Sequence, residues 1–269
     1  SSIDLVIVGG FRGVGKTTTL SYLARILTRR GRKVGIVTND QGRTLVDTKF
    51  QANLELPVVE VVGGCFCCRF DDLVTQADAL ISQYQVDIIL AEPVGSCTDL
   101  VATVCKPLES KYGDIFRVKP FTVIVDPLRV RELLFLDSGY SEDVQYLFCT
   151  QLQEADMILL NKIDTLPPAE KHEMISILRE RFQPWWISGI SAARGEGIEE
   201  WWQALHSGDD GVRQPSRVVD IDYIRYTRAE SELGWLNAEL TLRSTTPFEP
   251  KPLLDGFLRA LTSNLKDLS

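Results

Sequence analysis

Ile3-Asp4-Leu5-Val6-Ile7-Val8, continued by Gly9-Gly10-Phe11-Arg12-Gly13-Val14-Gly15-Lys16-Thr17-Thr18, is the stretch that decides the fold of this chain. An apolar run of strand length leads into a glycine-rich loop that matches G-x-x-x-x-G-K-[ST], and a helical pattern follows. This order predicts a phosphate-binding loop, because glycine-rich backbone brings N–H groups close to a polyphosphate at the positive end of a helix. The residues expected to bind the nucleotide here are Gly10, Arg12, Gly13, Val14, Gly15, Lys16, Thr17 and Thr18.

Side chains with a chemical role are expected around this loop. Lys16 would reach the β- and γ-phosphates, and the Thr17 hydroxyl would ligate Mg²⁺. Glu92 directly follows the strand expected at 86–91, where an acidic residue can hold Mg²⁺ or position the attacking water. We therefore expect Lys16 and Glu92 to be catalytic, with Thr17 and Glu92 at the magnesium ion.

Two further acids lie in the polar stretch after the second strand. Asp40 and Asp47 are candidates for a switch that senses the γ-phosphate and Mg²⁺. Asp47 is predicted to be both catalytic and a magnesium ligand. The alternative is a solvated loop acid, because polar loops often have no function of this kind.

Short apolar strands alternate with amphipathic helical patterns up to residue 206. We expect strands at 3–8, 33–37, 58–62, 86–91, 121–125, 157–160 and 185–188, and helices after the phosphate loop and at 71–84, 127–136, 141–154, 174–182 and 197–205. Residues 43–56 read as a short helix or a loop. The alternation predicts an α/β fold, a three-layer P-loop GTPase domain with a mostly parallel central sheet.

The composition changes after residue 206. Residues 207–216 are rich in Gly, Asp, Ser and Pro, which is typical of a linker. Residues 217–269 hold one strand pattern at 235–242 and one helical pattern at 251–265. We expect them to be the start of a small α+β C-terminal domain that is truncated here.

Asn161-Lys162-Ile163-Asp164 follows the strand expected at 157–160 and has the N-K-x-D pattern of guanine-nucleotide sites. Asp164 would accept hydrogen bonds from the guanine ring N–H and exocyclic amine, and the Lys162 stem would cover the base. Backbone N–H groups of Ser191-Ala192-Ala193, after the next strand, could meet the guanine oxygen. Alone the motif is often a solvated turn, but downstream of a phosphate loop it favours GTP or GDP over ATP and disfavours a metabolite kinase.

Cys65, Cys67 and Cys68 crowd into four residues directly after the strand expected at 58–62. In extended backbone Cys65 and Cys67 project to one side, and Cys68 joins them if the chain turns. Three thiolates suit Zn²⁺ or Co²⁺, with Ni²⁺ or Cu⁺ as alternatives, and leave a fourth position open for transfer. The other interpretation is three inert buried cysteines.

Strand ends at one edge of a parallel sheet lie close together, so the thiols should neighbour the γ-phosphate. We expect GTP state and metal affinity to be coupled by about 1–3 kcal/mol.

Net charge and hydropathy exclude some classes of function. The 269-residue chain has a net charge of −8, which argues against non-specific binding to nucleic acid or to an anionic membrane. No apolar run approaches the length of a membrane span, so a cytoplasmic protein is expected.

In order, G-x-x-G-x-G-K-T-T, G-C-x-C-C, E-x-x-G and N-K-x-D make residues 3 to about 205 resemble the CobW-type metallochaperone GTPases, relatives of the nickel-insertion GTPases. The resemblance implies a GTPase that binds a transition metal at the three cysteines and delivers it to a client protein or cofactor, and it leaves a nucleotide-dependent homodimer open. The runner-up is a nucleotide-gated chaperone for a cofactor enzyme, with structural cysteines.

The sequence departs from the family pattern at specific positions. Asn39-Asp40-Gln41-Gly42 stands where relatives often have Asn-Glu-Phe-Gly. Cys97, in an unusual version of the acidic motif, is an extra thiol near the site. A histidine-rich tract is absent, and His172 and His206 are expected on helix surfaces.

Overall fold

The central sheet is built around β1 (Ile3–Gly9), of which every residue after Ile3 is buried. The structure is a computed structural model that describes residues 2–40, 56–134, 140–207, 214–233 and 249–266. β1 pairs with β4 (Ile88–Glu92) on one side and with β5 (Phe116–Val118) and β6 (Thr122–Val125) on the other. A glycine-rich loop that follows β1 therefore lies at the middle of the sheet.

The strand order is β3-β2-β4-β1-β6-β7-β8, with β5 paired to β1 beside this path. The remaining strands are β2 (Val34–Asp40), β3 (Val58–Val62), β7 (Met157–Leu160) and β8 (Trp186–Gly189). All strand pairs in the described residues are parallel. Because β4, β6 and β7 are buried along their whole length, both faces of the sheet are covered, as a parallel sheet requires.

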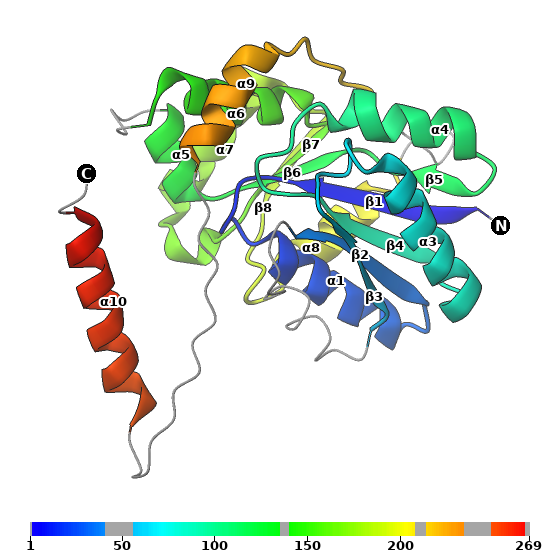
Figure 1. The fold of residues 1–269 in the computed structure, drawn as a ribbon, viewed down its shortest axis with the longest axis horizontal. Helices are drawn as coiled ribbons and strands as arrows, with labels where there is room; N and C mark the ends of the chain where they lie inside the picture. Colours follow the sequence, from blue (N-terminus) through cyan, green and yellow to red (C-terminus); the bar gives the residue numbers. More distant parts are fainter. Residues whose placement is uncertain (1, 41–55, 135–139, 208–213, 234–248, 267–269) are drawn as a thin grey trace. The chain divides into compact units, whose positions relative to one another are not determined.

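Helices cover the two faces of the sheet (Figure 1). They are α1 (Lys16–Arg29), α3 (Phe70–Tyr84), α4 (Lys106–Tyr112), α5 (Pro127–Leu134), α6 (Glu142–Glu154), α7 (Pro168–Phe182) and α8 (Ile198–Ala204), with a π-helical turn at Val101–Cys105 and a 3₁₀ turn at Ile163–Thr165. No helix in the described ranges is long and apolar enough to span a membrane. The predicted α/β fold with a mostly parallel sheet is confirmed.

Residues after 216 contain a helix that the sequence patterns did not predict. α9 (Tyr223–Glu232) packs on α6, where the Arg225 guanidinium lies 4.3 Å from the Tyr146 ring centroid and pairs with Asp143. It belongs to a compact unit of residues Ser1–Trp235. A second unit, Leu236–Ser269, contains α10 (Pro250–Lys266), which confirms the helix predicted at 251–265.

Two short elements also differ from the predicted ones. The short elements α4 and β5 were not predicted. The pattern at 43–56, apart from its last residue, and the strand pattern at 235–242 lie outside the described residues.

Candidate functional site

The residues singled out by sequence follow strands that lie next to one another. Along the carboxyl edge, from β3 to β8, the sheet order places in turn the cysteine loop, Asn39, Glu92, the phosphate loop, Asp126, Asn161 and Ser191. Because the carboxyl ends of parallel strands share one edge, these groups form one continuous row.

The phosphate loop is shaped by close backbone approaches. Gly15 has φ +99°, and a Cβ atom built there would lie 2.3 Å from the Asn161 amide nitrogen, so only glycine fits. No side chain caps α1, which begins at Lys16. The N–H groups of its first turn are thus oriented toward the loop, where a phosphate can accept from them.

Oxygen donors converge beside this helix end. The Thr17 hydroxyl donates to both carboxylate oxygens of Glu92, at 2.8 and 3.0 Å. Glu92 is buried at the end of β4, and the Lys16 ammonium donates to the carbonyl of Gly10 at 2.9 Å. A hydroxyl and a carboxylate are the ligand types that Mg²⁺ prefers, so this pair fits a magnesium ion bound with nucleotide phosphates. Asp47 and the side chain of Asp40 lie outside the described residues.

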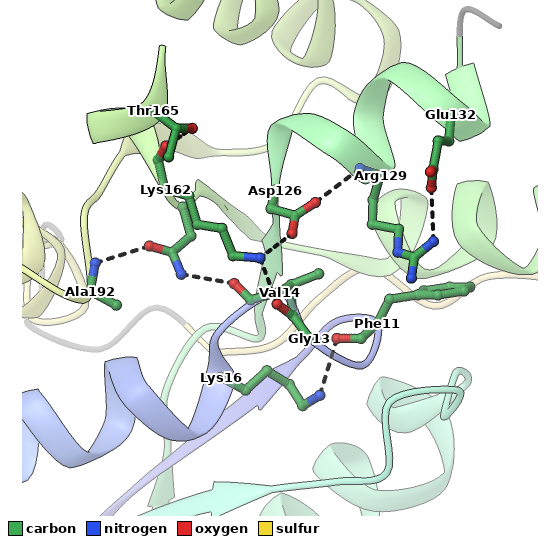
Figure 2. A network of polar contacts seen from close by, with 11 residues as sticks. Phe11, Gly13, Val14, Lys16, Asp126, Arg129, Glu132, Lys162, Thr165 and Ala192 are labelled. Atoms are coloured by element: carbon green, nitrogen blue, oxygen red, sulfur yellow. Dashed lines mark hydrogen bonds and ion pairs between the residues drawn. The ribbon is translucent and has the colours of Figure 1, made fainter. Parts of the chain in front are cut away.

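Lys162 binds the phosphate loop directly (Figure 2), and Asn161 binds it as well. The Asn161 amide donates to the Val14 carbonyl at 2.8 Å and accepts from the Ala192 N–H at 2.9 Å. The Lys162 ammonium donates to the Gly13 carbonyl at 2.7 Å and pairs with Asp126 at 2.5 Å. The N-K-x-D run therefore fixes its own loop against the phosphate loop and the loop of Ser191 to Ala193.

Asp164 remains accessible to a base. Its carboxylate is hydrogen-bonded by the Ser191 side chain, which lowers the pKa of Asp164, and Arg194 lies 3.7 Å away. The group is consequently ionised at neutral pH and can accept hydrogen bonds.

The thiols of Cys65, Cys67 and Cys68 lie within 4.8 Å of one another. The chain turns here instead of extending, and the Arg69 N–H donates to the Cys65 carbonyl at 2.9 Å. Sγ of Cys65 lies 2.6 Å from Sγ of Cys67, which is 3.9 Å from Sγ of Cys68. The three side chains thus converge as predicted, through a tighter turn than an extended strand provides.

The thiols differ in acidity because they hydrogen-bond to one another. Hydrogen bonds from Cys67, and then from Cys97 and Cys68, hold the pKa of Cys65 far below its ordinary value. The same contact with Cys65, together with burial, raises the pKa of Cys67. The contacts between the thiols therefore favour a thiolate within the cluster, and a thiolate is the form that binds metal.

Asn39 links the end of β2 to the cysteine loop. Its amide donates to the Val61 carbonyl at 2.8 Å and to the Gly64 carbonyl at 2.6 Å, one residue before Cys65. Sequence reasoning did not assign a role to Asn39 or to Asp126. Asp126 directly follows a predicted strand, as Glu92 does, and this position could have indicated that Asp126 belongs to the site.

The chain is similar to a known protein family and to curated proteins. A family profile described as "CobW/HypB/UreG, nucleotide-binding domain" matches residues 4–184. "Zinc-regulated GTPase metalloprotein activator 1" of Dictyostelium discoideum is 26% identical over 213 residues, or 68% of this chain and 44% of the relative. "Zinc chaperone CobW" of Sinorhizobium sp is 27% identical over 191 residues, or 61% of this chain and 52% of the relative. The chain spans about half the length of these curated relatives.

Solved structures share the fold. HypB from Helicobacter pylori in complex with nickel matches with a TM-score of 0.52 at 15% identity, covering 76% of this chain and 86% of that chain. The signal recognition particle receptor FtsY from Elizabethkingia anophelis in complex with GDP matches with a TM-score of 0.51 at 15% identity, covering 85% and 63%. At such identity the likeness extends to the fold alone.

Proposed function

The chain belongs to the CobW/HypB/UreG family, and we propose that it is a GTP-hydrolysing metallochaperone that binds a thiophilic transition metal and delivers it to a client protein in a GTP-dependent way. The observation that carries the proposal is the convergence of three thiols on the sheet edge that also holds the phosphate loop. The names of the curated relatives, which refer to zinc and to GTPase activity, support it.

Nucleotide binding is assigned to three groups of residues. Gly10 to Thr18 would hold the phosphates, because this loop and the uncapped start of α1 offer N–H groups and the Lys16 ammonium. Asp164 would accept from the guanine ring, and the Lys162 stem would cover it. Asn161 keeps these loops in register through Val14 and Ala192.

Hydrolysis is assigned to Lys16 and Glu92. Thr17 and Glu92 would hold Mg²⁺, which neutralises charge on the β- and γ-phosphates when bound. The buried carboxylate of Glu92 orients its neighbours, and Lys16 adds positive charge beside the phosphates. With no arginine assigned to the γ-phosphate, we expect slow turnover in isolation.

Metal binding is assigned to Cys65, Cys67 and Cys68. Two of the thiols are half-buried and one is exposed. A bound ion would therefore be partly shielded from solvent and could still enter and leave the site. The phosphate loop, β4 and Asn39 follow one another along the sheet, and Asn39 contacts Gly64 beside the cysteines. These neighbours connect the nucleotide site physically to the metal site. The linker predicted at residues 207–216, between the GTPase domain and a small C-terminal domain, stays a prediction. The nucleotide-dependent homodimer stays a prediction as well.

An anaerobic titration of Zn²⁺ and Co²⁺ against the full chain tests this function. It is run with Mg²⁺–GTP, with GDP and without nucleotide, on the native chain, on Cys67→Ser/Cys68→Ser and on Cys149→Ser as a matched control. We expect one metal per chain, lost in the double variant and kept in the control, with an affinity that nucleotide changes at least fivefold. Metal binding that is equal in all three nucleotide states would contradict the coupling, and no binding in any state would leave a guanine-nucleotide switch with structural cysteines.

A further inference from the structure

One face of α6 contacts two loops of the nucleotide site. Phe148, Gln151 and Glu154 recur at every third position, so they follow one another along the same side of the helix, and all three are buried. Phe148 meets the phosphate loop, whereas Gln151 and Glu154 meet the loop that follows β4. α6 therefore holds both loops from one side.

The contact with the phosphate loop is aromatic. The ring centroids of Phe148 and Phe11 lie 5.4 Å apart with an interplanar angle of 75°, an edge-to-face arrangement that aromatic pairs favour. The Phe11 carbonyl accepts from the Lys16 ammonium at 3.3 Å. Phe148 thus supports the part of the phosphate loop whose backbone contacts Lys16.

Gln151 holds the loop after β4 through its backbone. The Gln151 amide nitrogen donates to the carbonyls of Gly95 and Cys97 at 3.0 and 2.8 Å. Because only the nitrogen of a side-chain amide donates, these two acceptors fix the orientation of the group. The amide oxygen is buried and has no hydrogen-bond partner in the described part of the chain, which costs free energy that an apolar side chain would avoid. What glutamine adds at this position is therefore a fixed loop.

Glu154, one turn further along α6, holds the far end of the same loop. Its carboxylate accepts from the Val101 N–H at 2.5 Å and from the Thr98 hydroxyl at 3.4 Å. The loop is consequently bound to α6 at both of its ends, near Gly95 by Gln151 and near Val101 by Glu154.

This loop lies between the predicted magnesium ligands and the phosphate loop. It begins directly after Glu92, whose carboxylate accepts from Thr17. Gly95 then packs against the phosphate loop, because a Cβ atom built there would lie 2.7 Å from the Arg12 backbone nitrogen. Only glycine permits this approach. Since Arg12 belongs to the loop expected to hold the phosphates, the position of Gly95 limits the space beside them.

We propose that Gln151 is a positioning residue for GTP hydrolysis, which holds the loop after Glu92 against the phosphate loop through the carbonyls of Gly95 and Cys97. The inference rests on the GTP hydrolysis proposed above and deepens it. Phosphoryl transfer depends mainly on positioning and charge stabilisation, and a misplacement on the order of 1 Å can cost about 100-fold in rate. GDP lacks the γ-phosphate, so its affinity should not depend on this loop.

Gln151→Met tests the proposal in the full chain. Methionine is unbranched, fills a buried site and donates no hydrogen bond. Thr150→Val is the matched control, because Thr150 is buried beside Gln151 on α6 but its hydroxyl donates to the Tyr146 carbonyl of the same helix at 2.8 Å. Both changes remove a buried donor from α6, and only Gln151→Met removes one that holds the loop.

Single-turnover hydrolysis of Mg²⁺–GTP measures the rate constant, and equilibrium titration measures the affinity for GDP. We expect the rate constant to fall at least about tenfold in Gln151→Met and to stay within about twofold of native in Thr150→Val. GDP affinity should stay within about twofold of native in both variants. A merely structural role would lower the thermal midpoint of Gln151→Met and leave the rate constant, measured well below that midpoint, unchanged.

Two results would overturn the assignment and leave the GTPase intact. One is a native rate constant in folded Gln151→Met. The other is a slower rate accompanied by an equal loss of GDP affinity, which would mean that Gln151 supports the phosphate loop as a whole. A native chain that neither binds nor hydrolyses GTP would instead refute the proposed function itself.

Hydrogen exchange of the native chain decides the matter if Gln151→Met does not fold. Exchange of residues 94–101 should slow several-fold when a non-hydrolysable GTP analogue with Mg²⁺ replaces GDP, because the loop would then lie against the γ-phosphate. Equal exchange in the two states would show that this loop does not sense the γ-phosphate, and the proposal would be wrong.

Discussion

The Thr17 hydroxyl donates to the Glu92 carboxylate, with Oγ1 2.8 Å from Oε1 and 3.0 Å from Oε2. The two residues lie 75 positions apart, on α1 and at the end of β4, and they meet because β4 is the neighbour of β1 in the sheet. This contact places an oxygen-donor pair at the start of the helix that follows the phosphate loop. It is the position from which a magnesium ion can reach nucleotide phosphates.

Glu92→Gln is expected to lower GTP hydrolysis on the order of 100-fold. The amide keeps the size of the side chain and a hydrogen-bond acceptor for Thr17, but it removes the negative charge that would hold Mg²⁺. Phosphate release under saturating Mg²⁺–GTP measures the effect. Glu170→Gln, at a surface ion pair with Arg131, is the control and should keep native turnover. Native turnover in Glu92→Gln would remove Glu92 from the catalytic set.

Asp164→Asn is expected to reduce the preference for GTP over ATP at least 100-fold. A carboxylate accepts from both guanine donors, whereas an amide presents one donor of its own to them. Competition binding with GTP and ATP measures the ratio. Asp72→Asn, on the surface of α3 beside Arg69, is the matched control. An unchanged ratio in Asp164→Asn would refute guanine recognition by this residue.

The local motifs predicted much of this site, and the contacts between them were harder to predict. The run from Ile3 to Thr18 has strand, loop and helix in one continuous segment, so its structure could be predicted from the sequence. Asn39 and Asp126 act on loops that are distant in sequence, and their partners depend on strand order. That order is set by burial of whole strands, which local periodicity does not encode. α9 was missed for the same reason, because its stacking and ion-pair contacts lie on α6.

Asn39→Ala is expected to weaken the effect of nucleotide on metal binding. The amide donates two hydrogen bonds to the backbone at the start of the cysteine loop, and their loss frees Gly64 from β2. We expect one Zn²⁺ per chain to remain, while the ratio of Zn²⁺ affinities with and without Mg²⁺–GTP falls several-fold toward one. Competition titrations measure this ratio. Thr75→Ala, which removes an exposed hydroxyl on α3, should leave it unchanged.

A native ratio in Asn39→Ala would mean that nucleotide reaches the cysteines by another route.

Glu154→Gln is expected to change how stability depends on pH. Glu154 is buried on α6, where the Val101 N–H donates to it at 2.5 Å, and burial raises its pKa from 4.5 to about 8. Between these values the folded chain holds a proton that the unfolded chain has released. The free energy of unfolding therefore falls as pH rises through this window, by at most about 1.4 kcal/mol per pH unit, and levels off above it.

Glutamine keeps an acceptor oxygen for Val101 and cannot ionise, so this decline should be absent in Glu154→Gln. Relative to the native chain, the variant should gain stability between pH 5 and pH 9, on the order of a few kcal/mol. Urea unfolding at pH 5, 7 and 9 measures the difference, with Glu170→Gln as an exposed control whose pH profile should follow the native one. Parallel profiles for Glu154→Gln and the native chain would show that the Glu154 carboxyl titrates in its ordinary range.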